Sequence, residues 1–233
     1  TLSSSSAASD VYKRQVREYD RPLISGRFGI SERFVLRSFI ISNRRLRNPG
    51  VSQAVISVKE RAILVTGGAG FIGSHLVDLL MKEGRTVYVL DDLSSGSLKN
   101  LEEWIDHPGF RFIGGDVSQP IHESITSSAL SGGPDIGTIF HLAARVDVTS
   151  SLSSPHDDAR VNYIGTMNLL DFAVRTDVER FVFSSSAAVY GDPSELPVSE
   201  SSDKRPLSPY GLHKLSSEYL LDIYRPVSYT HLT

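Results

Sequence analysis

The sequence predicts an α/β protein whose parallel β-sheet is covered by helices on both faces. Short apolar segments alternate with segments of helical period, no hairpin signal joins them, and one apolar segment leads through three evenly spaced glycines into a helix. Strands connected by helices run parallel, and a parallel sheet buries both faces. The predicted strands lie at 62–65, 86–92, 110–117, 137–144 and 180–186, and two long helices are predicted at 157–175 and 209–223.

The first helix follows the strand at 62–65 and the glycines. Gly84 is expected to end it, because glycine commonly follows the last helical turn. Apolar residues recur there at helical spacing, so we expect one helical face to carry Phe71, Ile72, His75, Leu76, Leu79 and Leu80.

The segment TGGAGFIG places Gly67, Gly70 and Gly73 between that strand and that helix. In such a turn the first glycine permits the tight bend, the second lets the backbone approach a pyrophosphate, and the third lets the helix pack on the strand. The N-terminus of the helix adds free N–H groups and a positive dipole end. The turn therefore predicts a dinucleotide site of the Rossmann type.

Two aspartates follow the next two strands. Asp91 lies 18 residues after Gly73, near the distance of about 20 expected for the acid that binds the adenosine ribose. A carboxylate there accepts hydrogen bonds from the ribose hydroxyls and repels a 2′-phosphate, which favours NAD over NADP. Asp116 follows the third strand, where it could reach the adenine, although taken by itself it is better explained as an ordinary loop aspartate.

The segment SPYGLHK places Tyr210 four residues before Lys214, on one face of the last predicted helix. The spacing alone favours a solvated surface pair over a catalytic pair. An ammonium group lowers the pKa of a neighbouring phenol, which is about 10 when the phenol is free. Together with a dinucleotide turn and a serine at a strand end, the pair instead favours acid–base catalysis.

Seven motifs occur in order between Ala62 and about Tyr224, and with them the chain resembles the extended short-chain dehydrogenase/reductases. It is most similar to their branch of UDP-glucose 4-epimerase-like nucleotide-sugar enzymes. The motifs are TGGAGFIGSH, LDDLSSG, GDV, FHLAA, VNYIGTMNLL, FSSSAAVYGDP and SPYGLHK.

The resemblance implies a catalytic set of Ser186, Tyr210 and Lys214. Tyr210 would take a proton from a sugar hydroxyl while hydride moves to the nicotinamide, and Ser186 would hydrogen-bond the reacting oxygen. Lys214 would also bond the nicotinamide ribose. The implied NAD-binding residues are Gly67, Gly70, Phe71, Ile72, Gly73, Asp91, Asp92, Asp116, Val117, Leu142, Ala143, Ala144, Asn162, Tyr210 and Lys214.

The implied reaction is epimerisation at C4 of a UDP-hexose. The related dehydratases, and usually the decarboxylases, carry acidic groups where this chain has Ala187 and Ala188, which cannot transfer protons. An epimerase needs no additional group. The alternatives are another NAD-dependent nucleotide-sugar dehydratase, decarboxylase or reductase, and a non-catalytic NAD-binding domain.

Composition excludes several other classes of protein. Residues 58–233 carry 14 basic against 23 acidic side chains, a poor footprint for nucleic acid, and no apolar run reaches the length of a membrane span. The absence of cysteine excludes disulfide scaffolds and fits a reducing compartment, so we expect a cytoplasmic protein. We expect no metal site, and we assign no metal to His75, His141 or His213.

The two ends differ in composition from the rest of the chain. Residues 1–57 carry 10 basic against 4 acidic side chains and fit either a transit peptide or sequence upstream of the true start, the second being favoured. Segments 10–15 and 227–233 resemble translated sequencing adapters. We therefore expect a non-native or disordered leader at 1–57, an incomplete Rossmann domain at 58–226, and a non-native tail at 227–233.

The resemblance also implies a C-terminal substrate domain that this chain does not include. We therefore expect the chain to be inactive alone. It further implies a possible homodimer formed through the helices at 157–175 and 209–223.

Overall fold

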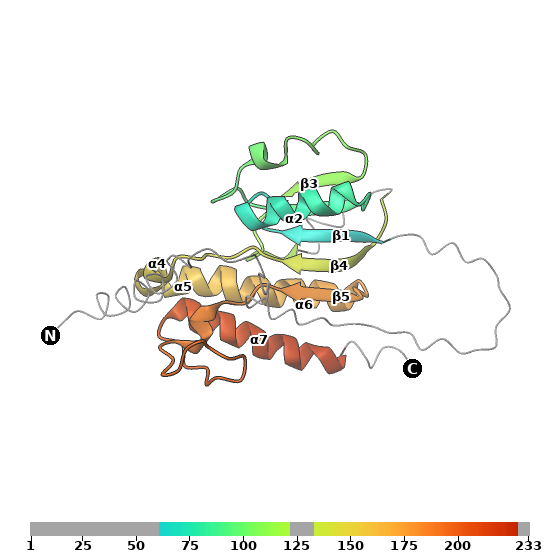
Figure 1. Cartoon of the computed structure of the whole chain (residues 1–233). Helices are drawn as coiled ribbons and strands as arrows, with labels where there is room; N and C mark the ends of the chain where they lie inside the picture. Colours follow the sequence, from blue (N-terminus) through green and yellow to red (C-terminus); the bar gives the residue numbers. More distant parts are fainter. Residues whose placement is uncertain (1–60, 122–132, 228–233) are drawn as a thin grey trace, which may run out of the picture.

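A computed structural model describes residues 61–121 and 133–227 of the chain, and Figure 1 shows its elements. Five parallel strands form one sheet in the order β3-β2-β1-β4-β5. The strands are β1 (Ala62–Thr66), β2 (Val87–Asp91), β3 (Phe110–Gly114), β4 (Ile136–His141) and β5 (Arg180–Phe183). The helices are α2 (Phe71–Lys82), α4 (Val148–Ser153), α5 (Pro155–Ala159), α6 (Gly165–Arg175) and α7 (Pro209–Val227).

The strand order confirms the predicted doubly wound sheet. The chain runs outward from β1 to β3, then returns to place β4 on the other side of β1. In such sheets the loops after the strands on either side of this reversal separate, and ligands bind in the crevice between them. The fold therefore places a crevice at the carboxyl ends of β1 and β4.

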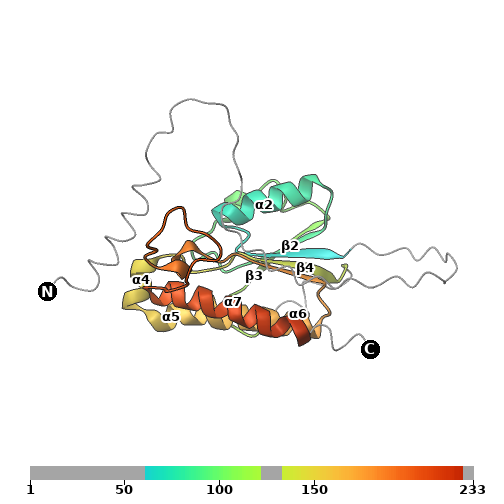
Figure 2. The same ribbon diagram turned by 60° about the horizontal axis from the view of Figure 1, so that its bottom comes forward.

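Helices cover both faces of the sheet, as Figures 1 and 2 show with α2 on one side and α6 and α7 on the other. Successive side chains of β1 enter opposite cores. Leu64 packs in a cluster with Leu169 of α6 and Leu221 of α7. Val65 packs in a second cluster with Val77 of α2. The near-continuous apolar strands are thus explained by burial on both faces.

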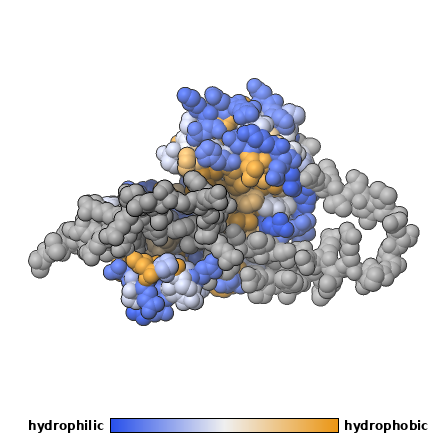
Figure 3. All heavy atoms as spheres, in the orientation of Figure 1, coloured by the Kyte–Doolittle hydropathy of each residue, from blue (hydrophilic) through white to orange (hydrophobic). Residues whose placement is uncertain are grey.

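Helix α2 does not bury the face on which the apolar residues are predicted to lie. Of the six residues assigned to it, only Leu80 is buried, whereas Phe71 is 79 % and Leu79 is 56 % exposed. Figure 3 accordingly shows apolar surface over α2. The buried side carries Gly73 and Val77. A Cβ on Gly73 would lie 2.1 Å from the carbonyl oxygen of Gly67, so this close approach determines which side of the helix faces the sheet.

The long helix predicted at 157–175 is interrupted by a π-helical turn, η2 (Arg160–Ile164), between α5 and α6. A π turn changes the hydrogen-bond partner of its carbonyls, and such turns are frequent at functional sites. Here the carbonyl of Asn162 accepts hydrogen bonds from the hydroxyls of Thr166 (2.8 Å) and Ser217 (3.0 Å). The turn thereby ties α6 to α7.

Two short 3-10 helices, η1 (Leu98–Leu101) and η3 (Ala187–Tyr190), complete the described fold. Segment 1–57 lies outside the described residues, and of segment 227–233 only Val227 is described, as the last residue of α7. Within the described ranges, no helix has the length and hydropathy that a membrane span requires. No group of three metal-ligating side chains was found there either.

Candidate active site

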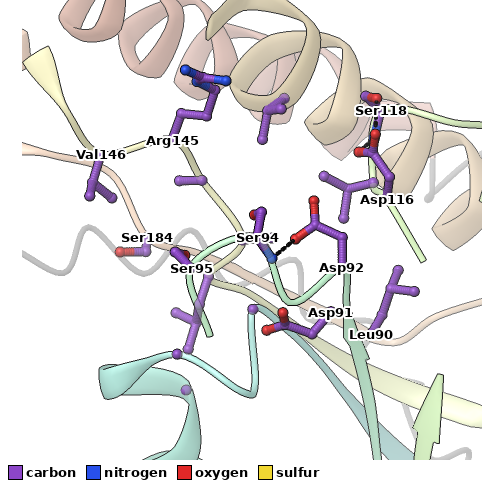
Figure 4. A pocket seen from close by; sticks show the side chains of 18 of the residues that line it. Leu90, Asp91, Asp92, Ser94, Ser95, Asp116, Ser118, Arg145, Val146 and Ser184 are labelled. Carbon is purple, nitrogen blue, oxygen red and sulfur yellow. Dashed lines mark hydrogen bonds between the residues drawn. The ribbon is translucent and has the colours of Figure 1, made fainter. Parts of the chain in front are cut away.

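A cavity of about 520 Å³ lies at the carboxyl ends of the strands. Figure 4 shows side chains from the loops after β2, β3 and β4 meeting around it. All predicted site residues except Asn162 and Ser186 line this cavity. Loop residues far apart in the sequence therefore share one wall, as expected where a parallel sheet ends.

The glycine turn forms one end of the cavity. Gly67 has φ = +69°, a conformation that residues with a Cβ rarely adopt. A Cβ at this position would also lie 2.7 Å from the backbone nitrogen of Ala143, so the turn can approach the β4 loop only with glycine here. The turn leads directly into α2, and the first N–H groups of a helix are able to bind an anion.

Asp91 is held rigidly at the end of β2. Its carboxylate accepts hydrogen bonds from the backbone N–H of Ala69 (2.9 Å) and of Leu93 (2.8 Å), and the residue is 7 % exposed. The neighbouring Asp92 is exposed and accepts from the backbone N–H of Ser94 at 2.9 Å. In Figure 4 both aspartates lie at the cavity. Asp91 is therefore a fixed negative charge beside the turn.

Asp116 and Val117 form the cavity wall after β3. The Asp116 carboxylate accepts hydrogen bonds from the backbone N–H (2.8 Å) and the hydroxyl (2.7 Å) of Ser118, and Figure 4 shows the two side chains together. These bonds orient the carboxylate within its own loop. Asn168 of α6 donates a hydrogen bond to the carbonyl of Val117 at 2.9 Å, which anchors the loop to the helix.

Tyr210 and Lys214 occupy successive turns of α7 and both line the cavity. Tyr210 is 7 % exposed, and its backbone N–H donates to the hydroxyl of Ser151 at 3.2 Å. The Lys214 ammonium donates to the carbonyl of Ser184 at 3.0 Å and lies 4.7 Å from the centre of the Phe183 ring. Such burial excludes the solvated-pair alternative, because both side chains are inside the protein.

Burial lowers the pKa of Lys214 to about 8, against the attraction of the Asp158 carboxylate, which raises it. A lysine in an apolar environment holds its proton less tightly because the charged form loses hydration. Near neutral pH the side chain is therefore still largely an ammonium ion, although this pH lies only slightly below its pKa.

This pKa predicts a specific pH dependence of stability. The unfolded lysine holds its proton up to about pH 10.5, whereas the folded one releases it near pH 8. The unfolded state thus binds more protons between these values, so the free energy of unfolding should rise with pH relative to a Lys214→Met variant, by at most about 1.4 kcal/mol per pH unit. Urea unfolding of both chains from pH 7 to 11 measures this, and parallel curves would contradict it.

His141 lies beneath the cavity as a buried neutral side chain. Burial, assisted by the charge of Lys214, lowers its pKa to about 3. The hydroxyl of Thr166 donates to the carbonyl of Asn162 and must therefore accept from His141 Nε2 (3.0 Å). His141 Nδ1 is then the acceptor for the hydroxyl of Thr66 at 2.8 Å, and that hydroxyl oxygen accepts from the backbone N–H of Ala143.

This chain of hydrogen bonds links the carboxyl ends of β1 and β4 to α6. It fixes the backbone of Ala143, which faces the glycine turn, without exposing a polar group to the cavity. The sequence shows an apolar strand interrupted by His141, but nothing in it indicates that the partners are two threonines from different elements.

Asn162 and Ser186 are placed differently from the other predicted residues. Asn162 is 1 % exposed, and its amide accepts from the backbone N–H and donates to the carbonyl of Arg145, both at 2.9 Å. It thus holds the β4 loop from behind. Ser186 is the N-cap residue of η3, and its hydroxyl oxygen accepts from the backbone N–H of Ala188 at 3.2 Å.

The structure also adds residues that the sequence did not single out. Ser184 and Ser185 line the cavity directly before Ser186, and Arg145 and Arg160 line it with exposed side chains. In the sequence, only the position of these residues next to predicted motifs could have indicated that they belong to the site. Asp158, 1 % exposed, accepts from Asn162 at 2.9 Å and pairs with His213 at 2.6 Å, a contact that only the fold could show.

Comparison with models of protein families shows the family to which the chain belongs. The family model described as GDP-mannose 4,6 dehydratase matches residues 64–232, more than half of the chain. The chain belongs to this family. It is a family of NAD-dependent epimerases and dehydratases, which agrees with the resemblance of the motifs.

Members of the family with different reactions are similar to the chain. A UDP-glucose 4-epimerase of Mycolicibacterium smegmatis is 41 % identical over 163 residues, which are 70 % of this chain and 50 % of that protein. A UDP-glucuronic acid decarboxylase 1 of Xenopus tropicalis is 38 % identical over 146 residues, 62 % of this chain and 32 % of that protein.

Solved structures of family members share the fold. A UDP-glucose 4-epimerase of Thermotoga maritima with UDP-glucose gives a TM-score of 0.63 at 38 % identity, covering 70 % of this chain and 50 % of that one. A UDP-glucose 4-epimerase of Brucella ovis in complex with NAD gives 0.61 at 36 % identity, covering 70 % and 47 %. The chain thus spans about half the length of the epimerases that it matches.

Proposed function

We propose that the chain carries the NAD-binding part of a nucleotide-sugar 4-epimerase that acts on a UDP-hexose. One observation carries the proposal: Tyr210 and Lys214, buried on one helix, line the same cavity as the glycine turn and Asp91. A phenol and an ammonium group beside a dinucleotide site form an acid–base pair that can act on a sugar hydroxyl.

The cofactor of the proposed enzyme is NAD, and the residues present fit it. The turn around Gly67 and the first N–H groups of α2 suit a pyrophosphate, and the fixed carboxylate of Asp91 suits a ribose with free hydroxyls. When bound, NAD supplies a nicotinamide that accepts and returns a hydride.

The side chains of this chain move the proton and orient the substrate. Tyr210 takes the proton of the C4 hydroxyl and later returns it, and the Lys214 ammonium stabilises the phenolate. Lys214 is held for this by the Ser184 carbonyl and the Phe183 ring. Ser186, at the start of η3, would hydrogen-bond the reacting oxygen once a substrate is present.

The wall around Tyr210 favours epimerisation over elimination of water. Among the described residues that line the cavity, the β5 loop and α7 contribute Ser184, Ser185, Tyr210 and Lys214 and no carboxylate, and the lining carboxylates belong to β2 and its loop, the β3 loop and Asp157 of α5. Expulsion of water at C5 and C6 requires a further acid and base, whereas return of hydride to the other face of a ketose requires only that the sugar turn over. Ala187 and Ala188, the first two residues of η3, likewise carry no group that could transfer a proton.

Decarboxylation is the second candidate, because a UDP-glucuronic acid decarboxylase is 38 % identical to the chain. Oxidation at C4 of a UDP-glucuronate makes the sugar a β-keto acid, which loses carbon dioxide readily. The two reactions therefore share Tyr210 and Lys214, and only the products distinguish them.

The test uses the 233-residue chain and the complete gene product. Calorimetric titration of the chain with NAD should detect binding. The complete product should interconvert UDP-glucose and its C4 epimer in an NMR assay without net NADH formation. UDP-N-acetylglucosamine and UDP-glucuronate are assayed in parallel. We expect the chain alone to convert none of them. If the chain binds no dinucleotide, the proposal is wrong. If the complete product releases carbon dioxide from UDP-glucuronate, decarboxylation is the reaction instead of epimerisation.

Asp91→Ser is expected to weaken NAD binding about tenfold and to reduce the preference for NAD over NADP, because the ribose loses a charged acceptor and a 2′-phosphate loses its repulsion. Glu103→Gln is the matched control, since it alters an exposed carboxylate that does not line the cavity. Calorimetric titration with both dinucleotides measures the effect. Equal losses in the two variants would contradict a specific role of Asp91.

A further inference from the structure

Helix α7 buries two charged side chains one turn apart. Lys214 and Glu218 are each 2 % exposed. A buried charge is tolerated only when it is paired and hydrogen-bonded, because burial removes its hydration. The partners of these two side chains therefore indicate what the helix is built to hold.

The two charges hold successive residues of the loop between β5 and η3. Lys214 donates to the carbonyl of Ser184 at 3.0 Å, and the hydroxyl of Ser185 donates to Oε1 of Glu218 at 2.6 Å. The next residue is Ser186, the N-cap of η3. The helix that carries Tyr210 is thus hydrogen-bonded to this loop at the two residues immediately before the predicted catalytic serine.

A third contact fixes the Glu218 carboxylate itself. Lys204, in the segment that leads into α7, donates to its other oxygen, Oε2, at 2.9 Å. The Lys204 side chain is 18 % and the Glu218 side chain 3 % exposed, so water screens this pair weakly. With each oxygen bonded to a different donor, the carboxylate has little freedom to rotate, and the Ser185 hydroxyl is held in place.

We propose that Glu218 is a positioning residue, which sets the serine loop against Tyr210 through the Ser185 hydroxyl. This inference rests on the proposed function, since Tyr210 and Ser186 are the groups that it aligns. Because the single hydroxyl hydrogen of Ser185 is committed to Glu218, Ser185 can only accept hydrogen bonds from a ligand in the cavity.

Alignment of this kind acts on the rate rather than on binding. A displacement of about 1 Å in a reacting group can cost about a hundredfold in rate. Glu218 is absent from the residues that line the cavity, so its loss should leave direct contacts to a dinucleotide intact. The expected signature is a lower kcat with little change in KM or in NAD affinity.

The experiment compares four variants of the complete gene product: Glu218→Gln, Ser185→Ala, the double variant, and Asp222→Asn. Asp222 is the matched control, an exposed acid one turn further along α7. Glu218→Gln and Ser185→Ala should each lower kcat for UDP-sugar conversion about 10- to 100-fold, and the dissociation constant of Glu218→Gln for NAD should stay within about twofold of wild type. The double variant should be no slower than the slower single one, and the control should match wild type.

Hydrogen exchange on the 233-residue chain provides a readout that does not depend on turnover. In Ser185→Ala, amides of residues 184–190 should exchange at least about tenfold faster, because the loop loses its attachment, while amides of β1 stay unchanged. Ser185→Ala also keeps the inference testable if Glu218→Gln does not fold, since it leaves the Lys204–Glu218 pair intact.

Several outcomes would overturn the inference. These are a kcat within about twofold of wild type in both single variants, a double variant whose loss is the product of the single losses, and unchanged exchange in residues 184–190. If wild type converts no UDP-sugar, the proposed function fails, and the exchange measurement alone then decides whether Glu218 holds the loop.

Discussion

Replacing Tyr210 by phenylalanine is expected to lower kcat of the complete gene product by about 10²- to 10⁴-fold, because the variant removes the group that we propose exchanges a proton with the sugar. The ring remains, and at 7 % exposure it should keep its packing at the start of α7. NAD affinity should therefore change little. Conversion of UDP-sugars, followed by NMR together with calorimetric titration of NAD, separates the two effects.

Tyr219→Phe is the matched control for this variant. It removes a hydroxyl from the same helix, at a side chain that is 57 % exposed and does not line the cavity. Its activity should equal that of wild type. If Tyr210→Phe retained activity within about twofold of Tyr219→Phe, the proton transfer would belong to another group and the proposed mechanism would be wrong.

Gly73→Ala is expected to cost about 3 kcal/mol of folding free energy and to weaken NAD binding severely. The added Cβ would lie 2.1 Å from the carbonyl oxygen of Gly67 and 2.7 Å from the Cα of Gly68, so backbone rather than a flexible side chain must move. Overpacking commonly costs about 1–3 kcal/mol, and contacts between backbone atoms relax least. Urea unfolding measures the loss of stability, and calorimetric titration measures the binding.

The control for Gly73→Ala is Gly114→Ala at the end of β3. There a Cβ meets only a carbon of the Phe112 ring at 3.7 Å, an ordinary contact. This variant should change the free energy of unfolding by less than about 0.5 kcal/mol. Equal destabilisation by the two alanines would show that the close approach of α2 to the turn is not what requires glycine at position 73.

The order of elements and most of the cavity wall could be predicted because both follow from local patterns. Each predicted strand is present, and the polar residues assigned to strand ends, such as Asp92 and Asp116, lie in the loops just beyond them. In a parallel sheet these loops gather at one edge whatever the packing details. A residue at the end of a strand could therefore be assigned to the site without knowledge of its contacts.

The orientation of α2 and the roles of Asn162 and Glu218 could not be predicted in this way. Helical period identifies an apolar face but not which face a neighbour buries, and here Phe71 and Leu79 are exposed because Gly73 packs against the turn. Asn162 accepts a hydrogen bond from the backbone of Arg145, and Glu218 accepts one from the hydroxyl of Ser185. Such partners lie far apart along the chain, so spacing carries no signal for them.

The amino-acid sequence by itself determined the doubly wound sheet, the glycine turn and the pair Tyr210 and Lys214, since each depends on residue types at short, regular spacing. Only the tertiary structure decided the burial that lowers the pKa of Lys214 to about 8, and the contacts that fix Asp91, His141 and Glu218. The physical reason is that desolvation and hydrogen bonding depend on distances between elements, which exist only after the helices have packed on the sheet.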